Sequence, residues 1–113
     1  MVTFEQVRKM ALALPNVEEG TSYGTAAFKT SGKLLARLKE DGDSLVVATT
    51  FEERDEMIDA EPGTYYITDH YLKYPWVLVR LSRVSPDALR DLLNRALRLA
   101  QKNTRAPKRR RGR

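Results

Sequence analysis

Few side chains in this chain could carry out covalent chemistry. It contains no cysteine and one histidine, His70, which directly follows Asp69. An Asp-His pair could in principle serve acid-base catalysis. A nucleophile, however, needs a base, and that base needs an orienting partner; the sequence offers no such set. We therefore favour a structural or surface role for His70 and predict no catalytic residue and no enzymatic activity.

Metal and cofactor sites have equally little support. The lack of cysteine excludes disulfides and thiolate metal sites. Gly20 and Gly24 are too far apart for a phosphate-binding glycine loop and lack its lysine. Acidic residues are dense between Glu52 and Glu61, but acids in a short exposed helix are usually solvated or complement its N-terminal dipole. We expect no metal and no cofactor.

Basic residues are the stronger chemical signal, and they are unevenly distributed. Of the 20 bases, seven follow Gln101 without one acid, which leaves 13 bases against 15 acids in the preceding body. Residues 103–113 lack apolar periodicity and contain Pro107 and Gly112, so we predict a disordered basic tail over 102–113 that is free to condense on a polyanion. Contact with anionic lipid and a simple solubility role are the alternatives, and we favour nucleic acid. The tail bases are Lys102, Arg105, Lys108, Arg109, Arg110, Arg111 and Arg113.

Length and composition predict one domain in front of this tail. A chain of 113 residues is long enough for one core but not for two, and 42% apolar against 31% charged residues is an ordinary globular balance. No apolar run approaches the roughly 20 residues that span a bilayer, and the N-terminus lacks a signal-peptide pattern. We therefore expect a cytoplasmic protein with no membrane insertion, whose domain covers residues 1–101.

Three segments carry helix-start signals. Residues 3–6 (Thr-Phe-Glu-Gln) and 50–53 (Thr-Phe-Glu-Glu) are capping boxes, in which the threonine hydroxyl accepts a hydrogen bond from the amide three residues later. Residues 85–87 (Ser-Pro-Asp) provide an N-cap, a proline at the first helical position and an acid in the first turn. Three helices should start at these places.

Short β-type runs separated by glycine-containing turns fill the space between the predicted helices. Segments 26–30, 34–40 and 44–49 should be three strands joined by tight hairpins. Segments 65–67 and 76–81 add one or two further strands. The resulting order is α-β-β-β-α-β-β-α, an α+β fold with helices packed on one face of an antiparallel sheet.

Alternation within the strand at 34–40 assigns its side chains to two faces. Leu34, Ala36 and Leu38 should share one face, and Leu35, Arg37 and Lys39 should share the other. If the apolar row packs inward, the opposite face is partly basic.

The strand at 76–81 shows the same division. Val77, Val79 and Leu81 form an apolar row that a helix layer should cover. Trp76 and Arg80 point the other way, toward the face left open.

The open face would therefore gather cations around an aromatic ring. Such a surface could contact phosphates through the cations and stack or wedge a base on Trp76. Equally, Arg37 and Arg80 could pair with Glu40 or Asp43, with Trp76 largely buried. The candidate nucleic-acid contacts of the body are Lys29, Lys33, Arg37, Lys39, Lys73, Trp76 and Arg80.

Three segments of the chain resemble the MmcQ/YjbR family. They are residues 23–28 (Tyr-Gly-Thr-Ala-Ala-Phe), 35–38 (Leu-Ala-Arg-Leu) and 74–81 (Tyr-Pro-Trp-Val-Leu-Val-Arg-Leu). The Tyr-Pro-Trp-Val part, which follows a His-Tyr pair at 70–71, is the most specific feature. Ala26 departs from the proline that many members carry, which should alter only a loop-to-strand junction.

This resemblance covers roughly residues 3–101 and implies a fold similar to bacterial frataxin (CyaY-like). It also implies DNA binding, because the sheet of such proteins resembles the double wing of a phage transcription factor. In that comparison the hairpin tip at 31–33 is a wing tip, although Asp41 and Asp43 at the neighbouring tip would repel phosphate. Frataxins are thought to hold iron on an acidic first helix, and here that helix has only Glu5 beside two bases.

These observations favour a non-enzymatic protein that binds nucleic acid, DNA more than RNA. Its contacts would come from a basic open sheet face and hairpin, with an unspecific polybasic tail. The alternative is a small protein- or ligand-binding module that uses the open face around Trp76, in which the folded body has no nucleic-acid role.

Overall fold

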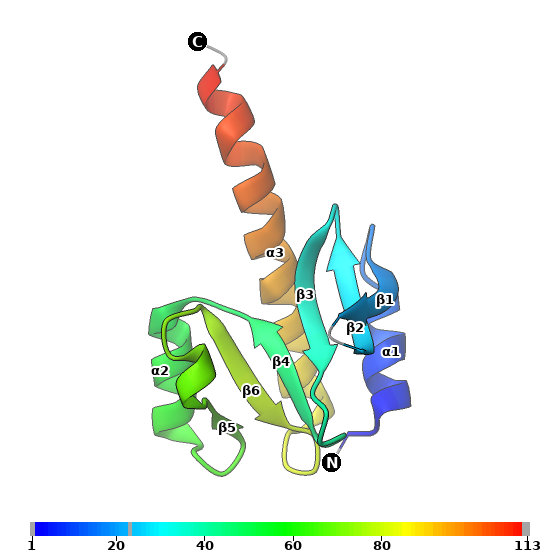
Figure 1. Cartoon of the computed structure of the whole chain (residues 1–113), viewed down its shortest axis with the longest axis vertical. Coiled ribbons are helices and arrows are strands. Elements are labelled where there is room, and N and C mark those ends of the chain that lie inside the picture. Colours follow the sequence, from blue (N-terminus) through cyan, green and yellow to red (C-terminus); the bar gives the residue numbers. More distant parts are fainter. Residues whose placement is uncertain (1, 23, 112–113) are drawn as a thin grey trace.

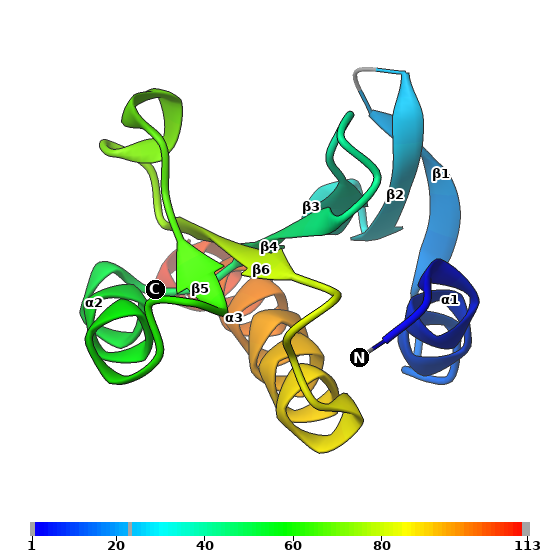
Figure 2. The same ribbon diagram turned by 90° about the horizontal axis from the view of Figure 1, so that it is seen from below.

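A computed structural model describes the backbone of residues 2–22 and 24–111 and the side chains through Lys102. Within these residues, six strands form one antiparallel sheet, and three α-helices lie against one of its faces (Figures 1 and 2). The strand order is β1-β2-β3-β4-β6-β5. The predicted α+β fold is confirmed. The helices are α1 (Phe4–Leu12), α2 (Phe51–Ala60) and α3 (Pro86–Arg111), with a short 3-10 helix η1 (Asp69–Tyr71). The strands are β1 (Glu18–Ser22), β2 (Thr25–Thr30), β3 (Lys33–Leu38), β4 (Ser44–Ala48), β5 (Tyr65–Tyr66) and β6 (Trp76–Arg80).

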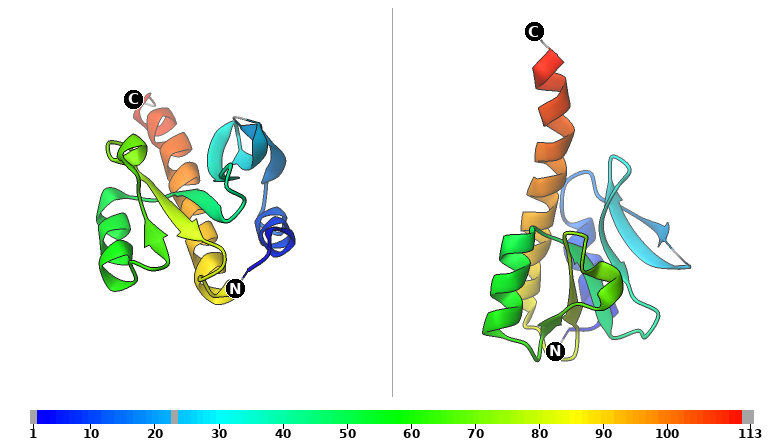
Figure 3. Two further views of the ribbon diagram at one scale, coloured as in Figure 1. Left: turned by 60° about the horizontal axis from the view of Figure 1, so that its bottom comes forward. Right: turned by 60° about the vertical axis from the view of Figure 1, so that its left-hand side comes forward.

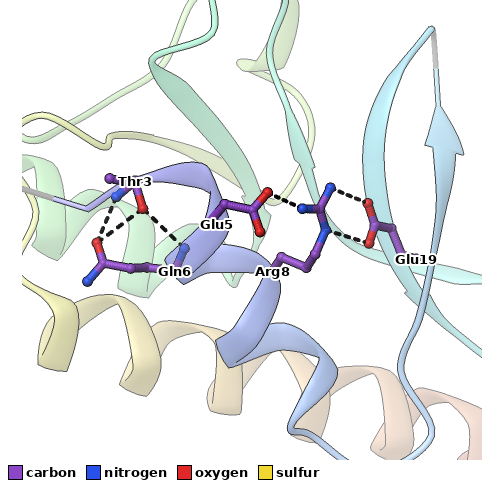
Figure 4. A network of polar contacts seen from close by, with 5 residues as sticks. All are labelled: Thr3, Glu5, Gln6, Arg8 and Glu19. Carbon is purple, nitrogen blue, oxygen red and sulfur yellow. Dashed lines mark hydrogen bonds and ion pairs between the residues drawn. The ribbon is translucent and has the colours of Figure 1, made fainter.

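All three predicted helix starts are confirmed by their cap hydrogen bonds. The Thr3 hydroxyl accepts from the Gln6 amide at 3.2 Å, and the Gln6 side chain accepts from the Thr3 amide at 2.9 Å, which completes a capping box (Figure 4). The Thr50 hydroxyl accepts from the Glu53 amide at 3.1 Å in α2. In α3 the Ser85 hydroxyl accepts from the Ala88 amide at 3.2 Å.

The main core lies between the sheet and the helices. Val77 and Val79 of β6 are fully buried there with Leu81, as the alternation predicted. Leu89, Leu92 and Leu93 lie near the start of the apolar stripe of α3 and belong to the same core. On the opposite face of the sheet, a smaller cluster forms from Val46, Leu78 and Tyr71, with Tyr66 and Trp76 packed against it. The face away from the helices is thus partly apolar.

A β-bulge changes which face of the sheet the first side chains of β3 occupy, compared with the prediction. Phe28 is the cross-strand partner of Ala36, and Lys29 is the partner of Leu34, so Leu35 is an extra residue between them. Leu35 and Ala36 both enter the helix-side core, whereas Leu34 lines a hollow with Arg37 on the open face. The expectation that Leu34 shares a face with Ala36 was wrong, because one extra residue breaks the two-residue period. Arg37 still faces away from the helices.

Strand β1 was not predicted. It pairs with β2 at the edge of the sheet, and its residues are mostly exposed, so it lacks the apolar alternation that marks a half-buried strand. Arg8 of α1 holds this edge: its Nε donates to Glu19 at 2.9 Å and its Nη2 at 3.1 Å, and it also contacts Glu5 (Figure 4). These hydrogen bonds from Arg8 lower the pKa of the Glu19 carboxyl.

The backbone of α3 continues to Arg111, well beyond the sheet (Figure 1). The disordered basic tail expected over 102–113 stays a prediction, since residues 112–113 and the side chains after Lys102 lie outside the described part of the chain. Within the described residues, no helix is both long and apolar enough to cross a membrane.

Candidate nucleic-acid interface

The face of the sheet opposite the helices is bounded by a wall on each side. The segment 68–75, which includes η1, rises beside β6, and strands β1, β2 and β3 curve upward on the other side (Figure 2). Strands β4 and β6 form the floor between the two walls. We call this hollowed face the open-face groove.

Two hollows lie on the open face, and a third continues the groove over the edge of the sheet to α3, which packs on the other face. The central one has a volume of about 350 Å³, a second has about 330 Å³, and the third, toward the start of α2, has about 560 Å³. The central hollow is lined by Leu34, Arg37, Val46, His70, Tyr71, Tyr74 and Trp76. The second is lined by Arg37, Lys39, Glu40, Thr68, His70 and Tyr71. The third is lined by Lys33, Leu34, Ala48, Thr49, Thr50, Phe51, Pro75, Trp76, Ala96, Leu99 and Ala100.

Arg37 of β3 lines two of the hollows but is only 7% exposed. Its Nη2 donates to the Tyr71 hydroxyl at 3.0 Å, and its Nη1 donates to the Thr25 hydroxyl at 3.2 Å. Nη1 also lies 3.6 Å from the carboxylate of Glu40. The sequence allowed Arg37 either to contact phosphate or to pair with an acid, and the structure favours the pairing with Glu40. The guanidinium joins β3 to the segment 68–75, which makes it a structural contact in this state.

Glu40 is ionised beside this cation. A hydrogen bond from its own backbone amide lowers its pKa, and the charges of Arg37 and Lys39 act in the same direction. The Glu40 carboxylate lies beside Arg37 and offsets most of the positive charge of that side chain. Lys39 therefore contributes more of the net positive charge at this end of the groove.

Arg54 was not singled out from the sequence, yet it fixes the other side of segment 68–75. This side chain of α2 is 5% exposed, and its Nη1 donates to the carbonyls of Tyr71 at 3.1 Å and Tyr74 at 2.8 Å. Its Nη2 donates to the Leu72 carbonyl at 3.4 Å, and the guanidinium lies 4.9 Å from the centre of the Phe51 ring. The available signal was a lone base within an otherwise acidic helix.

For Trp76 and Arg80 the sequence left two alternatives open: contact with nucleic acid on the open face, or a buried ring and a pairing with an acid. The structure lies between them. Trp76 is half-buried and lines both the central and the largest hollow. Arg80 is half-buried as well, with its guanidinium carbon 4.2 Å from the centre of the Tyr66 ring. Asp43 accepts hydrogen bonds from the amide and hydroxyl of Ser82. The partner that the structure gives to Arg80 is therefore an aromatic ring.

The predicted lysines divide between the groove and its margins. Lys33 and Lys39 line opposite ends of the groove, the first exposed and the second half-buried. Lys73 is exposed on segment 68–75, and Lys29 stands opposite Glu18 in the β1–β2 register. Lys102 is exposed on α3. The side chains of the other tail bases lie outside the described part of the chain, namely Arg105, Lys108, Arg109, Arg110, Arg111 and Arg113.

The acids at the β3–β4 turn serve the turn itself. One carboxylate oxygen of Asp41 accepts from the amides of Asp43 and Ser44, at 2.9 Å each, and the other accepts from the Ser44 hydroxyl at 3.2 Å. Partial burial would raise the pKa of Asp41, but these hydrogen bonds outweigh it and lower the pKa. Among the described residues, no group of three or more acids or histidines is placed to hold a metal ion.

The Arg37–Tyr71 contact leads to a first prediction. Tyr71→Phe removes the hydroxyl that accepts from Arg37 in a buried setting, so unfolding free energy should fall by about 1–2 kcal/mol. Tyr74→Phe is the matched control, because Tyr74 is 53% exposed, and it should change stability by less than about 0.5 kcal/mol. Urea unfolding of the two variants checks this. Equal stabilities would show that the Arg37–Tyr71 bond does not hold segment 68–75.

Comparison with known proteins covers most of the chain. Residues 12–99 match the family model described as YjbR. The crystal structure of the Deinococcus radiodurans protein DR2400, which has the family-model domain DUF419, is similar to this chain with a TM-score of 0.78 and 25% sequence identity. The similarity covers 90% of this chain and 80% of that one. A search of curated proteins found no match.

Proposed function

The chain belongs to the YjbR family, and we propose that it is a non-enzymatic, cytoplasmic protein that binds nucleic acid, DNA in preference to RNA. The observation that carries this proposal is the segregation of charge: seven bases and no acid follow Gln101, in a chain of net charge +5. The backbone of α3 carries this segment away from the sheet (Figure 1). A segment that leaves the sheet in this way can contact a polyanion without disturbing the core.

The folded body would add a smaller contribution through the open-face groove. Lys33 and Lys39 line its two ends, and Lys73 is exposed on one wall. Phosphate contacts from such lysines position a nucleic acid without reading its sequence. The body would thus supply orientation, and the basic segment at 102–113 would supply most of the affinity.

A salt titration of the full chain tests this proposal. If about five bases displace counterions, log K against log salt should have a slope near −4.5 for duplex DNA, and affinity should fall several-hundred-fold between ~50 and ~200 mM salt. Fluorescence anisotropy of labelled DNA measures this directly. Absence of binding at the lower salt concentration, or an affinity that does not change with salt, would contradict the proposal.

A second candidate function rests on the central hollow. Its walls combine Leu34, Val46 and Trp76 with polar groups from Tyr71 and His70, a mixture typical of small-ligand sites. In this case the folded body binds a small molecule or a protein and has no nucleic-acid role. Binding of an uncharged ligand would be insensitive to salt, which separates this function from the first.

A further inference from the structure

We propose that the open-face groove holds the unstacked bases of a single-stranded nucleic acid, so that the folded body prefers single strands to duplex. This inference rests on the proposed function and specifies its ligand. It draws on three independent features of the groove: its row of hollows, its aromatic rings and its charge.

The three hollows adjoin one another through shared lining residues. Leu34 and Trp76 line both the largest and the central hollow, and Arg37, His70 and Tyr71 line both the central hollow and the one beside Lys39. The row of hollows therefore runs from the sheet edge beside Lys33, where α3 lines it, onto the open face and on to Lys39. A row of adjoining hollows suits an extended chain better than a compact small molecule.

Aromatic rings are spaced along this row of hollows. Trp76 lies where the largest and central hollows meet, and Tyr74, which is 53% exposed, lines the central hollow. His70 is exposed and continues toward the Lys39 end, while Phe51, 46% exposed, lies at the opposite end. Because every base has a π-face, such rings bind single strands with little sequence preference.

The charge of the groove complements a polyanion. Lysines line both ends, and the linings of the largest and the central hollow, among the described residues, include no acid. Glu40 is the acid that lines the remaining hollow, where it lies 3.6 Å from Arg37. Asp69 and Lys73, both on segment 68–75, are exposed. A neutral or basic peptide would gain no electrostatic attraction from Lys33 and Lys39 at the two ends of the groove.

The walls of the groove favour a single strand over a duplex. Trp76 is the first residue of β6, one of the floor strands, and segment 68–75 and the strands β2 and β3 project from the same face of the sheet on either side of the floor (Figures 2 and 3). The bases of a duplex are stacked in pairs and present only their edges, so a base must leave the stack to reach a recessed ring. Duplex phosphates could still contact the basic segment at 102–113.

Trp76 is the sole tryptophan of the chain and therefore reports directly on the groove. We would titrate the full chain with oligothymidine and with a duplex of equal length, following Trp76 emission and, in parallel, the anisotropy of labelled DNA. Both DNAs should raise the anisotropy, but only the single strand should quench Trp76. If both bind and neither quenches, the inference fails while the proposed function stands; if neither binds, both fail.

Matched variants of the full chain complete the test. Tyr74→Ala should lower single-strand affinity roughly tenfold with little effect on duplex affinity, because it removes a stacking ring. Leu72→Ala is its control, since Leu72 is 55% exposed on the same segment but lines none of the three hollows. Unchanged single-strand affinity in Tyr74→Ala would overturn the inference.

Charge is tested in the same way. Lys39→Glu and Lys9→Glu change the net charge equally, but Lys9 is an exposed residue of α1, which packs on the other face of the sheet. The first should weaken single-strand binding several-fold more than the second. Equal losses would overturn the placement of the single-stranded DNA in the groove.

A neutral peptide gives a further test of the inference. Quenching of Trp76 by an unstructured neutral peptide, at the concentrations where oligothymidine quenches, would also overturn it and assign the groove to a protein partner.

Discussion

Truncation after Gln101 should weaken DNA binding roughly a hundred-fold or more at ~50 mM salt, because it removes the seven bases that release most counterions. The steep salt dependence should flatten at the same time, since the slope scales with the number of phosphates neutralised. What remains is the contribution of the open-face groove. Anisotropy titrations of the full and truncated chains at several salt concentrations measure both quantities.

The truncation leaves the described core intact, since Ala100 is the last buried residue of the main cluster. The truncated chain should therefore unfold at nearly the same urea concentration as the full chain, which serves as the control. Substitution of the same seven bases by glutamine provides a second control that keeps the chain length. An unchanged affinity after both alterations would locate DNA binding in the folded body and contradict the proposed role of the basic segment.

Arg54→Met should lower the unfolding free energy by about 2–4 kcal/mol, the largest loss that we expect from a single polar residue of this chain. Arg54 is buried and donates to the carbonyls of Tyr71, Leu72 and Tyr74. Methionine refills much of the volume but leaves these carbonyls without their donor, and a buried unsatisfied acceptor is costly. Urea unfolding measures the loss.

Arg90→Met is the matched control for this prediction. Arg90 is an exposed residue of α3 whose ion pair with Asp87 is also exposed, so its substitution should change stability by less than about 0.5 kcal/mol. Arg54→Met should also loosen segment 68–75, and a change in Trp76 emission would reveal this, because Trp76 follows that segment directly. Equal stability of the two variants would mean that α2 does not anchor this wall of the groove.

The helices illustrate what could be predicted from local sequence. A cap is an interaction between residues three positions apart, so Thr3, Thr50 and Ser85 could be recognised without any knowledge of the fold. The alternation of β6 was equally clear, because Val77 and Val79 are buried on one face and Trp76 lies on the other. Both signals are confirmed.

Strands β1 and β3 show where local patterns fail. β1 is an exposed edge strand, and it depends on pairing with β2 and on the ion pair between Arg8 and Glu19, a residue eleven positions away. The facing of β3 changes at the bulge around Leu35, which arises from its pairing with β2. Neither feature is visible in the hydrophobic period of the strand itself.

The sequence by itself determined the fold class, the main helix caps, the resemblance to the YjbR family and the separation of charge between body and C-terminal segment, because these follow from neighbouring residues and from composition. Only the tertiary structure decided how the arginines are used. The sequence left the pairing of Arg37 open and did not single out Arg54, yet both are buried and hydrogen-bonded to segment 68–75. The partners of a buried cation are distant in sequence, so its availability to a ligand depends on the packing of the whole chain.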